Sequence, residues 1–184
     1  MSKASLTRCM IALASVLLLG VVDVSAQQAS QEYLMHVPPR LVGRVDIVAP
    51  NPNVPPMTHD GTDNPQVFPP QFWDVGCNNA DGAEVTFYAT RPFRKSGGGQ
   101  PVERDAQLDL RIVSADPTAN WLVTNPTAVV DGQGGGGRQS TVTAESTAPG
   151  NATFHLTVSF LGGNFVDLPM GDYTFTVFGV ITAK

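Results

Sequence analysis

The sequence predicts an all-β fold, an antiparallel β-sandwich of about seven strands that follows an extended proline-rich arm. The chain has 184 residues, of which 18 are glycine and 15 proline, and 15% are charged. This composition disfavours helical bundles and coiled coils, while an aromatic content of 8% disfavours full disorder. Apolar residues also recur with a period of two between turn signals, as they do in half-buried strands.

Residues 1–26 have the pattern of a secretory signal peptide, with cleavage expected after Ala26. Lys3 and Arg8 precede an apolar run at residues 10–22, and small residues stand just before the expected cleavage point. An apolar run of this length is short of the roughly 20 residues that span a bilayer as a helix. We therefore expect a mature chain without a membrane span, secreted or located in the periplasm or at the cell surface.

The charge of the mature chain disfavours nucleic acid as a partner. Removal of residues 1–26 takes away two basic residues and one acidic residue, which leaves 9 basic against 15 acidic residues and a net charge of −6. Phosphate contacts require a concentrated basic surface. The histidines, His36, His59 and His155, lack the close paired spacing of zinc sites, so we expect no metal and no cofactor.

The first part of the mature chain reads as an arm and a linker. Residues 41–48 alternate with a period of two, which predicts one strand in an arm at residues 27–48. Residues 49–72 are expected to be a linker, because seven prolines fall within residues 50–70 and favour extended backbone. The sandwich domain is then expected at residues 73–184.

Alternating segments along this domain predict its strands. They lie at residues 84–90, 108–113, 121–124, 127–130, 141–145, 152–161 and 172–182. The side chains expected in the core are Phe87, Leu110, Trp121, Phe154, Leu156, Val158, Tyr173 and Phe175. On the last strand the same alternation turns Phe178 and Val180 outward, and on the segment 152–161 it turns His155 outward, toward solvent.

Cys77 is the one cysteine that remains after signal cleavage, so the mature chain forms no intramolecular disulfide. Its side chain is interpreted as a buried small hydrophobe, with an intermolecular bridge or a reactive thiol as alternatives. Stability then has to come from the hydrophobic core.

The segment LPMGDYTFTV at residues 168–177 resembles the late strands of immunoglobulin-like modules in bacterial exported proteins, where a Pro/Gly turn precedes a tyrosine and an alternating strand. The resemblance implies an immunoglobulin-like sandwich. It also implies a non-catalytic role, because such modules occur in pili, adhesins and envelope scaffolds and as accessory parts of enzymes. Pilin subunits share the detached terminal strand, but the single Cys77 departs from their paired cysteines.

The leading functional hypothesis is a non-catalytic module with a structural, assembly or adhesion role. The arm is its candidate interface, because Leu41, Val45 and Ile47 share one strand face that the arm cannot bury alone. Its strand is expected to join its own sandwich or that of a neighbouring chain. Phe178 and Val180 would offer an apolar landing surface, so the expected partner is a protein or a second copy of the chain.

Two alternatives come from other functional classes. Trp73 and Tyr88 are candidates for stacking against a carbohydrate, which makes a carbohydrate-binding module the second hypothesis. A small secreted hydrolase is the third, although the sequence has no G-x-S-x-G motif and marks no pair of acids as catalytic. Enzymatic activity is accordingly not expected.

Overall fold

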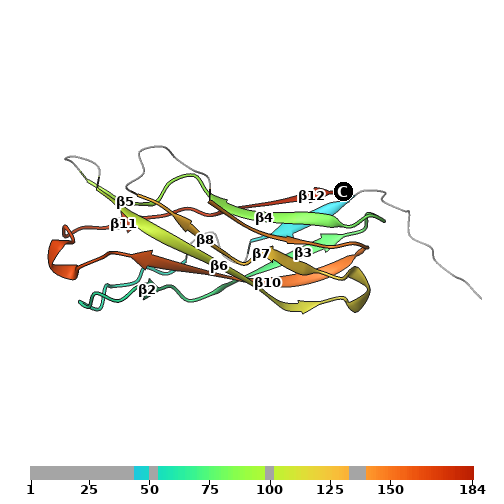
Figure 1. Ribbon diagram of the computed structural model, residues 1–184, viewed down its shortest axis with the longest axis horizontal. Coiled ribbons are helices and arrows are strands. Elements are labelled where there is room, and N and C mark those ends of the chain that lie inside the picture. The colour runs from blue at the N-terminus through green and yellow to red at the C-terminus, as the bar shows by residue number, and fades with distance from the viewer. Residues whose placement is uncertain (1–43, 50–53, 98–101, 133–139) are drawn as a thin grey trace, which may run out of the picture. The chain divides into compact units, whose positions relative to one another are not determined.

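Two antiparallel sheets, built from alternating segments of the chain, share one hydrophobic core (Figure 1). The structure is a computed structural model that describes residues 44–49, 54–97, 102–132 and 140–184. The strands are β1 (Val45–Val48), β2 (Gln66–Val67), β3 (Gln71–Cys77), β4 (Ala83–Ala89), β5 (Phe93–Lys95), β6 (Glu103–Ala115), β7 (Leu122–Asn125), β8 (Thr127–Val130), β9 (Ser140–Glu145), β10 (Gly150–Leu161), β11 (Tyr173–Thr174) and β12 (Phe178–Ala183). The all-β prediction is confirmed.

The larger sheet is organised around its two longest strands, β6 and β10, which pair from Ala115–Ala152 to Asp105–Leu161. Its strand order is β1-β3-β10-β6-β5-β11, with β2 also paired to β10 and β8 also paired to β6. The strand β1 is therefore one edge of this sheet. The smaller sheet has the order β12-β4-β9-β7.

The core lies between the two sheets. Phe87 and Val142 from the smaller sheet and Leu110 and Phe154 from the larger one are buried in a single cluster. The Phe154 ring makes edge-on contacts with Phe87 and Trp121 at centroid distances of 6.2 and 5.5 Å. Burial of these apolar side chains is the main source of stability in a domain without disulfides.

The predicted core residues all contact this interior. Phe87, Leu110, Trp121, Phe154 and Leu156 are buried. Val158, Tyr173 and Phe175 are half-buried and pack against the buried clusters.

The strand count differs from the prediction because several segments cross from one sheet to the other. The expected strand 172–182 is two strands: β11 pairs with β5 in the larger sheet and β12 pairs with β4 in the smaller one. The same change of sheet separates β4 from β5, and β7 from β8 at Pro126. Among the described residues, the range 83–183 accordingly holds nine strands where about seven were expected.

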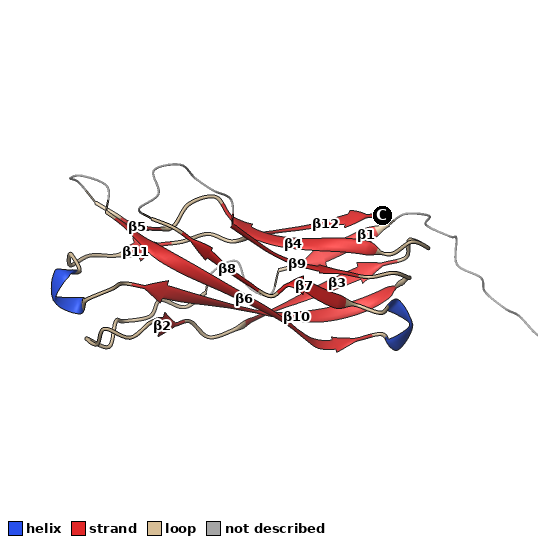
Figure 2. Cartoon of the chain, in the orientation of Figure 1, coloured by secondary structure: helices blue, strands red, loops and turns tan. Residues whose placement is uncertain are grey.

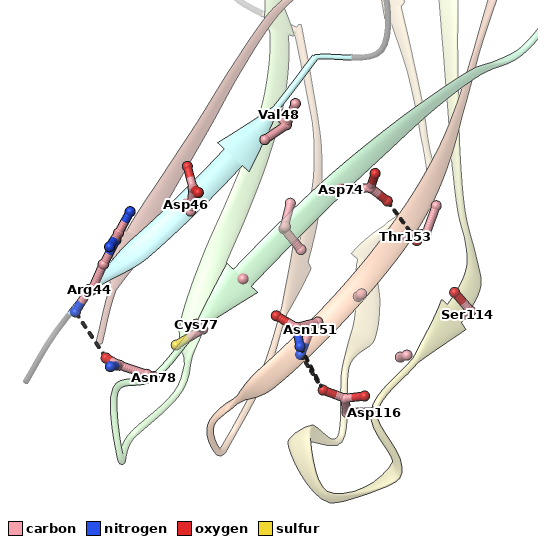
Figure 3. Close-up of a pocket in the computed structure, with 14 residues that line it drawn as sticks. Arg44, Asp46, Val48, Asp74, Cys77, Asn78, Ser114, Asp116, Asn151 and Thr153 are labelled. Atoms are coloured by element: carbon pink, nitrogen blue, oxygen red, sulfur yellow. Dashed lines mark hydrogen bonds between the residues drawn. The ribbon is translucent and has the colours of Figure 1, made fainter. Parts of the chain in front are cut away.

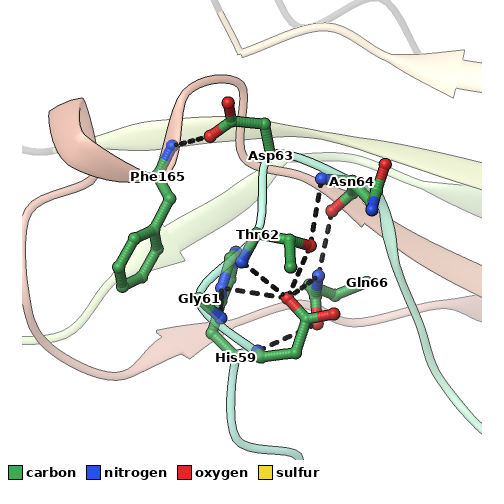
Figure 4. A network of polar contacts seen from close by, with 8 residues as sticks. His59, Gly61, Thr62, Asp63, Asn64, Gln66 and Phe165 are labelled. Carbon is green, nitrogen blue, oxygen red and sulfur yellow. Dashed lines mark hydrogen bonds and ion pairs between the residues drawn. The ribbon is translucent and has the colours of Figure 1, made fainter.

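The range 49–72 was predicted to be a linker, but much of its described part packs onto the larger sheet. The strand β2 pairs with β10, and β3 begins at Gln71. A polar network holds the segment between residues 59 and 66 (Figure 4). In it, Asp60 Oδ1 accepts hydrogen bonds from the Thr62 backbone N–H and from the Gln66 side-chain amide, both at 2.8 Å. In the described part of this range, Pro65, Pro69 and Pro70 therefore lie between or beside paired segments.

The same network fastens this segment to the connection between β10 and β11. The Phe165 N–H donates to Asp63 Oδ1 at 2.7 Å, and the His59 ring stacks on the Phe165 ring at 5.0 Å. The described residues from 44 onward belong to one compact unit, 40–184, so the expected domain start at residue 73 is too late. The arm strand and the proline-rich segment are part of the same unit.

Helical structure among the described residues consists of two short 3-10 turns, η1 (Pro117–Ala119) and η2 (Phe165–Asp167), drawn in blue in Figure 2. None of the helices in that part of the chain has the length and apolarity needed to cross a membrane. The expected signal peptide and the residues of the arm before Arg44 lie outside the described residues.

Candidate functional site

An open groove of about 570 Å³ lies on the outer face of the larger sheet, across β1, β3, β10 and the end of β6 (Figure 3). The alternation of each strand turns apolar side chains to the core and, apart from Val48, polar side chains into this groove. The outward side chains that line it are Arg44, Asp46, Val48, Asp74, Asn78, Ser114, Asp116, Asn151 and Thr153.

Strand register places these polar side chains in two adjacent rows. One row runs from Asp46 over Gly76 to Asn151. The next row runs from Asp74 to Thr153 and on to Ser114, which faces Thr153 across the β6–β10 pair. Residues that are up to about 100 positions apart in the sequence therefore meet on one surface.

Hydrogen bonds between its own residues orient the walls of the groove. The Thr153 hydroxyl donates to Asp74 Oδ1 at 2.8 Å, and the Asn151 side-chain amide donates to Asp116 Oδ2 at 3.1 Å. The Asn151 backbone N–H also donates to Asp116 Oδ2, at 2.7 Å. The carboxylate of Asp46 and the guanidinium of Arg44 have no side-chain partner among the described residues.

Gly76 lines the groove between Asp46 and Asn151. A Cβ atom added at Gly76 would lie 3.1 Å from Asn151 Oδ1, which is tighter than most Cβ contacts, so a larger residue there would push against the Asn151 side chain. A glycine within a strand often marks a place where another molecule approaches the backbone closely. Here it lowers the floor between Asp46 and Asn151.

Next to the groove, on the same face, His155 is enclosed by Phe72 and Arg111. His155 was predicted to be exposed, but its side chain is only 6% exposed. The Phe72 ring covers it at a centroid distance of 5.1 Å, and the Arg111 Nε–H donates to its Nδ1 at 2.5 Å. Burial lowers the pKa of His155, and the positive charge of Arg111 lowers that pKa further.

The predicted interface residues lie on two different surfaces. Val45 and Ile47 face inward from β1 and pack against the core, whereas Leu41 lies outside the described residues. Phe178 and Val180 face outward from the smaller sheet and are each 44% exposed. The structure therefore seats β1 beside β3, and not on the Phe178 and Val180 surface.

The two predicted carbohydrate-stacking residues are not on one platform. Trp73 points into the interior, where its ring contacts Phe87 at 5.1 Å. Its indole N–H is buried there and has no hydrogen-bond partner among the residues that the structure describes. The alternation of β3 turns Trp73 toward the core and the neighbouring Phe72 outward. Tyr88 does lie on an outer face, that of the smaller sheet, and stacks on Phe178 at 5.4 Å.

Sequence reasoning missed the groove itself. Asp46, Asp74, Asn151 and Thr153 all occupy outward positions of alternating strands, which was the available signal. Polar residues at such positions are ordinary, and only the pairing register shows that these four share one surface. The described residues contain no group of three His, Cys, Asp or Glu side chains placed to hold a metal ion.

Comparisons of the chain with protein-family models, with curated proteins and with solved structures found no match. The chemistry of the groove is therefore deduced from its own residues.

Proposed function

We propose that this chain is an exported, non-catalytic module with an immunoglobulin-like sandwich, and that it has a structural, assembly or adhesion role at the cell envelope or outside the cell. The observation that carries the proposal is the position of β1. A strand from the N-terminal arm pairs with β3 and forms one edge of the larger sheet.

The contacts of β1 show why this strand matters to the domain. The pairing runs from Val45–Cys77 to Val48–Asp74, and it directs Val45 and Ile47 into the core. The Ile47 side chain reaches Gly179 of β12, where a Cβ atom would lie 2.9 Å from Ile47 Cδ1. The arm strand thus closes the seam between the two sheets at this edge.

Closure by an arm strand supports an assembly role because the same pairing works between chains. An extended segment adds to a sheet edge through main-chain hydrogen bonds and side-chain pockets, whichever chain supplies it. Tethering raises the effective concentration of the chain's own β1, which favours closure within one chain when the protein is dilute. Exchange of β1 between neighbouring chains is the corresponding mode of assembly.

An engineered disulfide tests this pairing directly. Val45 and Cys77 lie opposite each other next to the Arg44–Asn78 pair, in which the Asn78 N–H donates to the Arg44 carbonyl at 3.1 Å. Hydrogen-bonded and non-hydrogen-bonded pairs alternate, so Val45–Cys77 is a close pair with a Cα separation of about 4.5 Å. That separation suits a disulfide.

The Val45→Cys variant of residues 27–184 should therefore form a disulfide between the introduced thiol and Cys77 on mild oxidation, identified by peptide mapping. A bonded monomer on a non-reducing gel would show closure within one chain, and a bonded dimer would show exchange. Val48→Cys is the matched control, because residue 48 lies opposite Asp74 and faces away from the core. Absence of the disulfide in the Val45→Cys variant would contradict the assigned position of β1 and with it the proposed role.

A further inference from the structure

We propose that the groove of Figure 3 binds a saccharide without acidic groups, with Phe72 as the apolar surface beside it. The inference concerns ligand binding and goes beyond the structural role of the arm. It follows from the free polar groups in the groove, from its charge and from the exposed aromatic ring on the same face.

The free polar groups match a hydroxyl-rich ligand. A sugar hydroxyl both donates and accepts a hydrogen bond, so a site for it needs acceptors and donors within one short span. Asp46 offers both carboxylate oxygens, and Asp74 offers Oδ2, since its Oδ1 is taken by Thr153. Arg44 supplies the guanidinium donors. Hydrogen bonds to these ionised groups are the stronger kind.

The charge of the groove selects among saccharides. Its lining holds three carboxylates, those of Asp46, Asp74 and Asp116, against the single guanidinium of Arg44. A uronic acid, a sulfated sugar or a phosphate would meet repulsion there, whereas an uncharged sugar would not. The surrounding mature chain, with its predicted net charge of −6, acts in the same direction.

The apolar part of the site is Phe72, which is 50% exposed on the groove face, two residues before Asp74 on β3. Its ring rests on His155, which the Arg111 guanidinium holds in place. The apolar C–H face of a pyranose ring can cover such a ring while its hydroxyls reach the groove. An extended chain of sugars would cross both features.

One wall of the site comes from the N-terminal arm, because Asp46 lies in β1 and Arg44 directly precedes that strand. Saccharide binding therefore requires β1 to be paired with β3. It does not depend on whether β1 comes from the same chain or from a neighbour, so a bonded dimer in the disulfide experiment leaves this inference intact.

The test is to titrate the ¹⁵N-labelled protein, residues 27–184, with oligosaccharides and to monitor its amide chemical shifts by NMR. The probes are maltohexaose, cellohexaose, an N-acetylglucosamine hexamer and, as the acidic comparison, a galacturonic acid hexamer, each at millimolar concentration. We expect at least one of the three uncharged probes to shift the amides of Gly76, Asn151 and Thr153, and the acidic probe to leave them unchanged.

Two substitutions in the proposed site and two control substitutions elsewhere test whether the saccharide binds at this site and not on another part of the surface. Asp46→Asn and Phe72→Ala should each weaken binding roughly tenfold, since each removes one of the stronger contacts. The matched controls, Glu84→Gln and Tyr88→Ala on the outer face of the smaller sheet, should bind as the unchanged chain does. No shift with any uncharged probe, shifts centred on Tyr88 and Phe178, or undiminished binding by both site variants would overturn the proposal.

Discussion

At the scale of single residues, Phe154 is one of the largest fully buried side chains of the core. Its ring is fully buried and contacts aromatic rings from both directions, Phe87 and Trp121. Phe154→Ala should lower the free energy of unfolding by about 3–5 kcal/mol, because the lost burial adds to the cost of a cavity. Urea denaturation measures this loss. Val166→Ala, at a residue 89% exposed, should change stability little, and equal effects of the two substitutions would contradict the assigned core.

His155 should make stability depend on pH. Burial, followed by the charge of Arg111, lowers its pKa in the folded chain, so the unfolded chain takes up a proton first as pH falls. The stabilising contribution of the neutral imidazole is complete above the unfolded value of about 6.5 and declines as pH falls below it. The free energy of unfolding should therefore decrease between about pH 7.5 and 5.5.

The His155→Gln variant tests whether His155 causes this decrease in the free energy of unfolding. Glutamine keeps a hydrogen-bond acceptor for Arg111 but does not titrate. The variant should lose less stability over this interval than the unchanged chain. Asp60, whose pKa is lowered mainly by hydrogen bonds from Thr62, acts at more acidic pH and does not enter. An identical pH dependence in both proteins would show that His155 is not the group responsible.

At the scale of strands, the seam between β1 and β12 is closed by a close approach at Gly179. A Cβ atom there would lie 2.9 Å from Ile47 Cδ1, 3.0 Å from Trp73 Cζ3 and 3.1 Å from Phe87 Cε1. Gly179→Ala should therefore destabilise the fold by about 1–3 kcal/mol, because three packed side chains have to move. Thermal unfolding measures the effect, and Val180→Ala on the exposed side of the same strand is the control. A gain in stability from Gly179→Ala would mean that the seam is loosely packed.

Alternation in the sequence located most of the longer strands that stay within one sheet. The segment 152–161 was predicted almost to its ends, and its inward residues Phe154 and Leu156 are buried. Alternation carries no information on the pairing partner, so the change of sheet within residues 173–183 could not be seen. The strand β3 was overlooked for another reason. Its inward Trp73, Val75 and Cys77 alternate regularly, but Pro69 and Pro70 immediately before it suggested a linker.

The groove and the burial of His155 depend on neighbours that are distant in sequence. His155 occupies an outward position, as predicted, yet the long side chains of Phe72 and Arg111 cover it from the adjacent strands. Asp74 and Thr153 are 79 residues apart and meet through strand register. The local alternation of residues predicts which face of the sheet a side chain lies on. Its neighbours on that face can be predicted only when the order and register of the strands are known.

At the scale of the whole domain, the strand β1 and the sandwich belong to one compact unit, residues 40–184. From β1, Val45 and Ile47 pack against the core, and Ile47 approaches Gly179 together with Trp73 and Phe87 at the edge between the sheets. The strand also supplies one wall of the groove. Loss of β1 should therefore affect stability, the environment of Trp73 and ligand binding together.

Deletion of residues 27–50 from the mature chain tests this coupling. It should lower the free energy of unfolding by about 2–3 kcal/mol, or roughly 6–10 °C in midpoint, because Val45 and Ile47 no longer cover the core edge. Tryptophan emission should shift to the red as Trp73 becomes exposed. Deletion of residues 27–43, which retains β1, is the matched control and should preserve both properties.

Sedimentation then separates the two modes of closure, since lower stability at an unchanged monomer mass indicates pairing within one chain and loss of a dimer indicates exchange. If stability, emission and mass are all unchanged by the longer deletion, the arm is a passive tail and its assembly role is contradicted.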